Sequence, residues 1–201
     1  AAITTDGYIG NGLILDGAND YLLNSDDASL VMNPTDAFSI SLWFKGTDNT
    51  AELVSRMDPG QSNRGYTFRI LNSGGARLGL LIGESFGGTP VALRATTSLS
   101  SEVVDGNWHY LVGTYDGSTD LSGINIYVDG ENTTITSDGN LFDDNLSAGN
   151  LTNPNIPLSL GVRDGGGSNS NDTNGEIDEA RVIRTELTRD WIKTEYNNMS
   201  D

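Results

Sequence analysis

The stretch Phe38–Phe44, with the sequence FSISLWF, decides the fold class of this chain. Large apolar residues occupy its even-numbered positions, and serine occupies two of the three odd-numbered ones. Successive side chains of a β-strand point to opposite faces of the sheet, so this alternation predicts a half-buried strand. An α-helix would instead repeat its apolar residues every three or four positions.

Further short apolar runs along the chain have the length of strands and end at Gly, Asn, Asp or Pro. Short strands at such spacing indicate an all-β sandwich, and nothing in the pattern suggests the strand–helix–strand units of a parallel sheet. The predicted strands are Gly65–Leu71, Leu78–Ile82, Trp108–Tyr115, Ile124–Val128, Leu158–Val162 and Ile177–Ile183.

Two local signals mark a turn and a helix. Asp129-Gly130 predicts a two-residue hairpin between Ile124–Val128 and Asn132–Thr136, because both central residues of this turn need positive φ. Thr188 can cap a helix that contains Trp191, Ile192, Glu195 and Tyr196. Leu187 and Ile192 would form its hydrophobic staple. We expect this one short C-terminal helix to lie against an edge of the sandwich.

Length and composition fit one domain. The chain has 201 residues, which suits a single all-β domain over residues 1–201. The polar segments Asp138–Pro157 and Asp164–Gly175 are predicted to be long loops of that domain, since the strand or helix after each is too small to fold alone. We expect the domain to be a monomeric module excised from a larger protein.

The charge narrows the possible partners. With 11 Lys and Arg against 28 Asp and Glu, the formal net charge is −17, and the chain has no cysteine. Nucleic acids and anionic membranes need a basic surface, so both are disfavoured, whereas divalent cations are natural partners. No apolar run approaches the roughly 18–20 residues of a membrane span, so no membrane insertion is expected. A disulfide-free extracellular domain would depend on its core and on bound metal.

Several motifs together resemble the laminin-G-like, concanavalin A-like jelly-roll domains, including their bacterial members. The resemblance implies an all-β jelly roll of two antiparallel sheets and a binding module of secreted or surface proteins, without naming a ligand. The motifs are Tyr8–Leu22 (YIGNGLILDGANDYL), Phe38–Phe44, Gly106–Gly117 (GNWHYLVGTYDG), Ile126–Gly130 (IYVDG), Gly175–Ile183 (GEIDEARVI) and Leu187–Asn197 (LTRDWIKTEYN).

The resemblance implies a structural Ca²⁺ site built from Asp16, Asp20 and Asp178. Asp16 and Asp20 belong to the short turn DGAND, and Asp178 to the strand near the C-terminus. Calcium takes six to eight oxygen ligands, which Asp and Asn turns can supply. The alternative is that Asp16-Gly17 forms a plain tight turn and Asp178 caps a strand.

A second acidic set could hold a rim calcium that bridges to a ligand. Asp164 and Asp172 lie in a Gly-rich segment, and Asp116 follows the strand WHYLVGTY. The alternative is a solvated loop, because Asp, Asn and Gly are the usual residues of exposed turns.

Glu176-Ile177-Asp178-Glu179 begins like the acid pair of concanavalin A-like retaining glycosidases. The place of that motif's second glutamate is taken here by Ala180 or Arg181, and on a regular strand Glu179 should point away from the face that carries Glu176. We therefore expect no enzyme. His109 is the only histidine and no G-x-S-x-G motif accompanies it, which favours a packed strand histidine.

Glycan recognition needs aromatic rings and hydrogen-bonding groups at a sheet edge or loop rim. The candidates are Arg56, Tyr66 and Asp116, although each arginine could equally pair with a surface acid. Trp43 and Trp108 lie within predicted strands and should be packing residues.

The leading hypothesis is a non-catalytic, calcium-stabilised module of a larger bacterial secreted or surface protein. It would recognise a glycan or cell-surface polysaccharide and serve in adhesion. The alternatives are a structural or protein-interaction spacer that binds no sugar and a relative of glycoside hydrolases or lyases.

Overall fold

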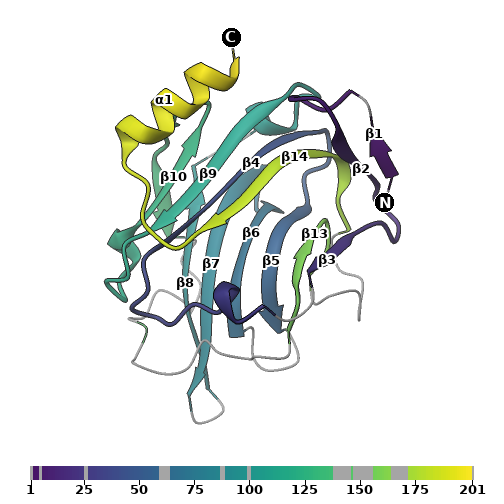
Figure 1. Ribbon diagram of the computed structural model, residues 1–201. Coiled ribbons are helices and arrows are strands. Elements are labelled where there is room, and N and C mark those ends of the chain that lie inside the picture. The colour runs from purple at the N-terminus through teal and green to yellow at the C-terminus, as the bar shows by residue number, and fades with distance from the viewer. Residues whose placement is uncertain are drawn as a thin grey trace.

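The computed structural model describes residues 2–4, 6–24, 27–58, 64–86, 89–98, 101–137, 146, 156–163 and 172–200. These residues form two seven-stranded antiparallel sheets that face each other, with one helix, α1 (Arg189–Ser200), outside them (Figure 1). Three short 3₁₀ turns, η1 (Ala28–Leu30), η3 (Ser101–Val104) and η4 (Leu121–Gly123), lie between strands. The predicted all-β sandwich of two antiparallel sheets is confirmed.

The first sheet contains the first and the last strand of the described chain, β1 and β14. Its middle strand, β4, pairs with β14 on one side and β9 on the other. Strand β14 also pairs with β2, so this late strand lies between two early ones, β2 and β4. The strand order is β1 (Ala2–Thr4), β2 (Gly12–Asp16), β14 (Asn174–Ile183), β4 (Phe38–Gly46), β9 (His109–Tyr115), β10 (Ile124–Val128) and β11 (Glu131–Asn132).

The second sheet is a meander extended at both edges. Strands β5 to β8 follow one another along the chain and pair in sequence. The strand order is β12 (Ile135–Ser137), β8 (Thr89–Thr97), β7 (Ala76–Phe86), β6 (Arg64–Asn72), β5 (Ala51–Asp58), β13 (Leu158–Leu160) and β3 (Leu22–Asn24).

One apolar core lies between the sheets. Phe38 of β4 contacts Tyr66 of β6 at 5.2 Å between ring centroids, and Tyr115 of β9 at 5.8 Å. Glycine at position 113 lets the two sheets approach closely, because a Cβ there would lie 3.0 Å from the Phe68 ring. The core side chains of β4 come from the alternating positions that predicted that strand, whereas those of β5 and β8 belong to strands that were not predicted.

Helix α1 packs on the outward face of the first sheet rather than against an edge, which corrects the expected position. The backbone N–H of Trp191 donates to Oγ1 of the predicted cap residue, Thr188, at 3.3 Å. Ile192 and the staple residue Leu187 join a second apolar cluster with Trp43 and Tyr110. The sequence predicted the helix, its cap and its staple, but only the tertiary fold placed it over these aromatic rings.

This placement also corrects the prediction that Phe38–Phe44 is half-buried. Ser39, Ser41 and Trp43 point outward, yet all three are buried. The Ser39 hydroxyl donates to the Thr185 carbonyl at 2.8 Å, and the N–H of Leu187 donates to Ser39 at 2.9 Å. The segment that leads into the helix therefore seals the outward face of β4.

The Asp129-Gly130 turn is confirmed, but its second strand is shorter than predicted. Asp129 and Gly130 have φ of 51° and 78°, and Val128 pairs with Glu131. After β11 the chain changes sheet, because β12 pairs with β8 of the second sheet. The predicted strand Asn132–Thr136 is thus two short strands in different sheets.

The predicted loops Asp138–Pro157 and Asp164–Gly175 lie mostly outside the described residues. Asn174 and Gly175 of the second segment already belong to β14. No helix in the described part of the chain is long and apolar enough to cross a membrane.

Candidate functional site

The outward face of the second sheet carries charged and polar side chains in cross-strand rows. Glu52 of β5 lies opposite Arg69 of β6, and in the next row Ser55 lies opposite Thr67. The second row continues through Leu81 of β7 to Arg94 of β8. Partners directly opposite in antiparallel strands share a face, so these groups gather on the side away from the core.

Glu52 is the centre of this face. Its carboxylate is fully buried, accepts a hydrogen bond from Thr67 Oγ1 at 2.6 Å and pairs with Arg69 Nη1 at 3.3 Å. Its carbonyl accepts a hydrogen bond from Thr173 Oγ1 at 2.8 Å, which joins β5 to the residue before β14. A buried carboxylate is tolerated only with such partners, so Glu52 holds the Arg69 guanidinium in place.

One N–H donor of the Arg69 guanidinium is unpaired among the described residues. Its Nε is buried and has no hydrogen-bond partner among the described residues, while Nη1 is directed at Glu52. An arginine presents five N–H donors in a fixed fork and has no acceptor. The Arg69 side chain is 12% exposed, so a hydroxyl or carboxylate oxygen brought to this face can approach its exposed part.

An apolar patch adjoins the charged rows. Met57, Leu81 and Ala92 form a separate cluster of buried residues. Gly65 and Gly83 lie between them in the same cross-strand row, opposite Met57 and Ala92. Met57, Leu81 and Ala92 are 0%, 6% and 4% exposed, so this cluster is packed beside the arginines.

Arg56 and Tyr66, both predicted to bind glycan, are cross-strand partners on the inner face of the second sheet. Tyr66 is buried, its hydroxyl donates to the Leu30 carbonyl at 3.0 Å, and burial raises the pKa of the phenol. Arg56 is 4% exposed. The structure thus brings the two residues together, but on the core side of the sheet rather than at an open rim.

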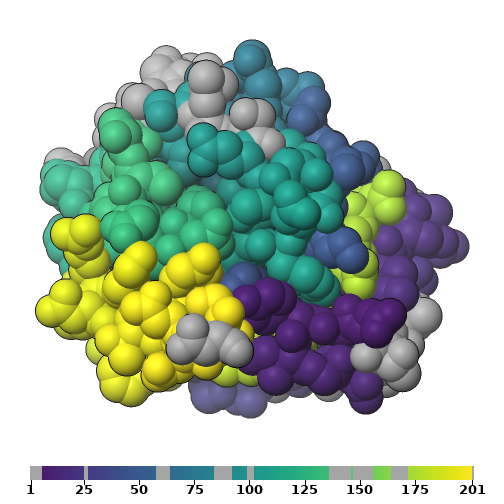
Figure 2. Space-filling model, turned by 90° about the horizontal axis from the view of Figure 1, so that it is seen from above, coloured from purple at the N-terminus to yellow at the C-terminus, as the bar shows by residue number. Residues whose placement is uncertain are grey.

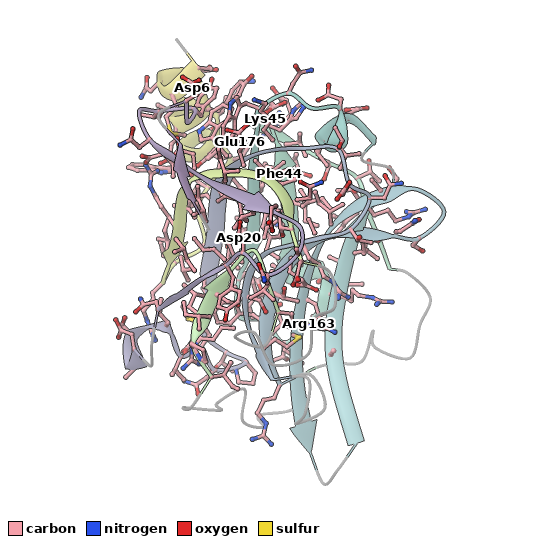
Figure 3. The ribbon with its side chains drawn as sticks, turned by 90° about the vertical axis from the view of Figure 1, so that its right-hand side faces the viewer. Asp6, Asp20, Phe44, Lys45, Arg163 and Glu176 are labelled. Carbon is pink, nitrogen blue, oxygen red and sulfur yellow. The ribbon has the colours of Figure 1, made fainter. Side chains whose placement is uncertain are left out.

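The predicted calcium ligands Asp16, Asp20 and Asp178 do not gather. No group of three or more acidic or histidine side chains that could hold a metal ion occurs among the described residues. Asp16 pairs with Asn174 in β14, which is four residues, or about 13 Å of strand, from Asp178. Asp16 Oδ1 instead accepts the Ala18 N–H at 3.0 Å, and Figure 3 shows Asp20 well away from Glu176. The described residues do not fit the predicted three-carboxylate site.

Asp178 has partners of its own. It is 7% exposed, Oδ2 accepts the Ile9 N–H at 2.8 Å, and Oδ1 accepts the Glu179 N–H at 2.8 Å. A Cβ at Gly7 would lie 2.8 Å from Oδ2, so this loop closes tightly on the carboxylate. Tyr8 of the same loop stacks on Trp43 with ring centroids 3.5 Å apart. Asp178 therefore anchors the loop that leads into β2.

A bulge in β14 corrects the predicted direction of Glu179. Asp178 pairs with Trp43 and Arg181 with Ser41, so three steps along β14 match two along β4. Glu179 occupies the bulge with φ of 50°, a conformation uncommon for a residue with a side chain. Its carboxylate pairs with Arg181 at 2.5 Å.

Both glutamates of the glycosidase-like motif consequently lie on the helix-covered side. Lys45, the partner of Glu176 at 2.9 Å, is 5.8 Å from the Trp108 ring, which packs on the cluster under α1 (Figure 3). Arg181, the partner of Glu179, also pairs with Glu195 of α1. Each carboxylate therefore has a cation as its partner.

The second predicted acidic set is only partly described. Asp164 lies outside the described residues, whereas Asp172 is half-buried next to Thr173. Asp116 is exposed and accepts the Ser118 N–H at 2.8 Å, as expected of a turn residue. Nothing in these contacts links Asp116 to Asp172.

His109 is held between two carboxylates. Nδ1 lies 2.8 Å from Asp129 Oδ2, and Nε2 lies 3.1 Å from Asp105 Oδ1. The hydrogen bond to Asp129 is the main reason why the pKa of His109 is raised. The residue joins the 105–108 loop to the Asp129-Gly130 turn.

A cleft runs along the edge where β3 and β13 face β2 and β14. It consists of two adjoining hollows of about 320 and 350 Å³ that share Leu22, Leu160 and Ala180. Leu22 and Leu23 are 47% and 45% exposed. This edge therefore exposes apolar side chains beside a hollow.

Sequence reasoning missed Glu52, Thr67 and Arg69. The available signal was a glutamate beside the apolar residues Ala51, Leu53 and Val54, which is notable because glutamate is mostly exposed in folded proteins. Their grouping depends on the register between β5 and β6, which the sequence pattern does not specify.

Comparison with known protein families identifies the family of this chain. A family model described as the concanavalin A-like lectin/glucanases superfamily, of the laminin G type, matches residues 16–193. None of the curated proteins matches the sequence.

Solved structures with the same fold are distant in sequence. The binding domain of Paraclostridial Mosquitocidal Protein 1 is 16% identical with a TM-score of 0.66, and the match covers 98% of this chain but 45% of that one. Domain 4 of AbnA, an extracellular arabinanase from Geobacillus stearothermophilus solved with arabinotriose, is 21% identical with a TM-score of 0.62, covering 96% and 81%.

The CBM40 of the Ruminococcus gnavus IT-sialidase, bound to α2,3-sialyllactose, is 14% identical with a TM-score of 0.62. That match covers 91% of this chain and 95% of the other. At such identities the structural matches establish the fold alone. The family match extends over most of the sequence, and the chain belongs to the concanavalin A-like lectin/glucanases superfamily as a laminin G-type domain.

Proposed function

We propose that this domain is a non-catalytic carbohydrate-binding module of a larger secreted or surface protein. The observation that carries the proposal is the partly exposed Arg69 guanidinium, whose partner Glu52 is held by Thr67, next to the buried cluster of Met57 and Leu81. A sugar ring offers hydroxyls at its edge and C–H groups on its faces, so it needs both kinds of surface. The partly exposed arginines on the outward face of the second sheet, Arg69 and Arg94, supply the hydrogen-bonding groups, while the apolar cluster of this face is buried.

The two outward faces differ in a way that supports this choice. Helix α1 and Leu187 cover the aromatic rings of the first sheet, so that face is packed inside the domain. On the second sheet most outward side chains are buried as well, but Arg69 and Arg94 are partly exposed. The structurally similar CBM40 was solved with sialyllactose and the AbnA domain with arabinotriose, which agrees with a glycan as ligand.

The carboxylates of β14 support binding rather than hydrolysis. Glycoside hydrolysis uses two carboxyl groups that flank the scissile bond, one as acid and one as base or nucleophile. Here Glu176 pairs with Lys45 and Glu179 with Arg181. Asp178 is committed to backbone N–H groups.

A glycan array followed by calorimetry with the best glycan tests the proposal. Arg69→Ala should weaken binding at least tenfold, because hydrogen bonds to a charged group are worth about 1.5–3 kcal/mol. Arg189→Ala is the matched control, since Arg189 is an exposed helix residue paired with Glu131. Unchanged affinity of Arg69→Ala, or no binding to any glycan, would contradict the proposed site.

The apolar edge favours a second candidate, a protein-interaction or spacer module. β3 is the last strand of the second sheet, and its leucines are half exposed. Exposed edge strands pair readily with another chain. Leu22→Lys combined with Leu23→Lys should then abolish association with a protein partner, as measured by pull-down with the other domains of the parent protein.

A further inference from the structure

A small groove lies between helix α1 and β14, away from the second sheet. Its volume is about 270 Å³, slightly below the roughly 300–1,000 Å³ of pockets for drug-sized ligands. This size suits about one sugar ring. The groove is lined by Arg181, Trp191, Thr194, Glu195, Asn198 and Met199.

One face of the helix builds most of the groove. Trp191, Thr194, Glu195 and Asn198 are spaced by three or four residues, so they lie in one row along α1. Trp191 is 60% exposed, the largest exposed fraction among the exposed large apolar residues of the described chain. The helix itself lies open to solvent, as the yellow surface in Figure 2 shows. An indole beside amide, hydroxyl and carboxylate groups is an amphipathic surface.

The floor of the groove is held rigid by a charged network. Arg181 pairs with Glu179 at 2.5 Å and with Glu195 through Nη1. Glu195 Oε2 also accepts the Tyr110 hydroxyl at 2.6 Å. Burial, helped by Glu195, raises the pKa of Tyr110, so its hydroxyl stays protonated and keeps donating. Arg181 and Tyr110, each bound to a different oxygen, thus fix the orientation of the Glu195 carboxylate.

The charges of this network select the ligand. Two carboxylates already pair with the single guanidinium, so no positive charge is left over for an anionic group. The net charge of the chain, −17, adds to the repulsion of anions. The groove therefore suits a neutral sugar rather than a sialic or uronic acid.

We propose that the groove between α1 and β14 is a second glycan-binding site that takes a neutral pyranose stacked on Trp191. Hydroxyls of the sugar would donate to the Glu195 carboxylate and accept from the Asn198 amide. The inference rests on the proposed function, because it assigns this site to the same class of ligand. The two sites lie on different sheets and can be tested separately.

The test is titration of the full chain, labelled with ¹⁵N, with maltotriose, cellotriose, mannotriose and, as the charged probe, α2,3-sialyllactose. At least one neutral trisaccharide should shift the indole N–H signal of Trp191, assigned from Trp191→Phe. Trp191→Ala should weaken binding of that sugar at least tenfold, which corresponds to about 1.4 kcal/mol, whereas Trp191→Phe should stay within threefold. Sialyllactose should leave the Trp191 signal in place.

Lys193→Ala is the matched control, because Lys193 is exposed on the same helix but pairs with Glu131. An unchanged Trp191 signal with all three neutral sugars overturns the inference. If a sugar binds, and Arg69→Ala removes the binding while Trp191→Ala does not, the second site fails and the proposed function stands. If Trp191→Ala alone removes it, the second site stands and the face around Arg69 fails.

Discussion

The carboxylate of Asp178 accepts a hydrogen bond of 2.8 Å from the backbone N–H of Ile9, a residue 169 positions away in the sequence. This contact holds the loop that carries Tyr8 onto Trp43. We expect Asp178→Ala to lower the free energy of unfolding by about 1–3 kcal/mol, because two backbone N–H groups lose a partner. Urea denaturation, monitored by tryptophan fluorescence, measures this loss of unfolding free energy.

Asp16→Ala is the control for that experiment. Asp16 is exposed and its hydrogen bond reaches only two residues ahead, so the loss should stay below about 1 kcal/mol. Equal effects of the two variants would show that Asp178 does not anchor the loop.

Calcium stabilisation of the domain is still a prediction from the sequence and the family resemblance. A cation bound only to the folded state stabilises it by mass action, so excess EDTA should lower the melting temperature and added Ca²⁺ should restore it. Since Asp16 and Asp178 lie apart, Asp20→Asn and Asp178→Asn, scanned separately with and without EDTA, show which carboxylate carries the effect. A thermal transition that EDTA leaves unchanged would rule calcium out.

The His109 bridge should make stability depend on pH. The pKa of His109 is raised above its ordinary value of about 6.5, chiefly by the hydrogen bond to Asp129. Its contribution is therefore complete below about pH 6.5 and is lost as the pH rises through the raised folded-state value. The pKa of Asp105 is lowered to about 2, mainly by the Asn107 N–H, so that partner stays charged throughout this range.

Chemical denaturation of the wild type and of His109→Gln between pH 5.5 and pH 8.5 checks this dependence. The difference in unfolding free energy between the two proteins should be largest at the acid end and should shrink as the pH rises. A difference that is constant across the range would mean that His109 does not titrate against the two carboxylates.

Ile192 should be the main anchor of α1. It is fully buried in the cluster with Trp43 and Tyr110, so Ile192→Ala removes packed methyl groups at a cost of about 2–5 kcal/mol. Asn197→Ala, on the exposed side of the helix, should change stability by less than about 0.5 kcal/mol. Thermal unfolding of both variants by circular dichroism tests whether the helix is part of the cooperative core.

Local features of the fold were predictable because their causes are local. The alternation in Phe38–Phe44 predicted β4. Asp129-Gly130 predicted the hairpin turn between β10 and β11, and Thr188 predicted the start of α1. The strands β5 and β8 were not predicted. Glu52 and Ser55 interrupt the apolar pattern of β5 on the outward face of the second sheet, and Arg56 interrupts it on the inner face.

The candidate sites were much less predictable. Arg56 and Tyr66 are neighbours, but on the inner face of their strands. Glu179 departs from simple alternation because the bulge in β14 adds one residue to the strand. Neither the choice of face nor the bulge follows from residue spacing.

The sequence by itself determined an acidic, cysteine-free, all-β domain with a C-terminal helix, because alternation, turn residues and caps act over a few positions. Only the tertiary structure decided which strands pair, in what register, and which face the helix covers. These choices depend on packing between residues far apart in the chain. They bring Glu52 to Arg69 and Trp191 to Arg181, and both proposed binding sites depend on them.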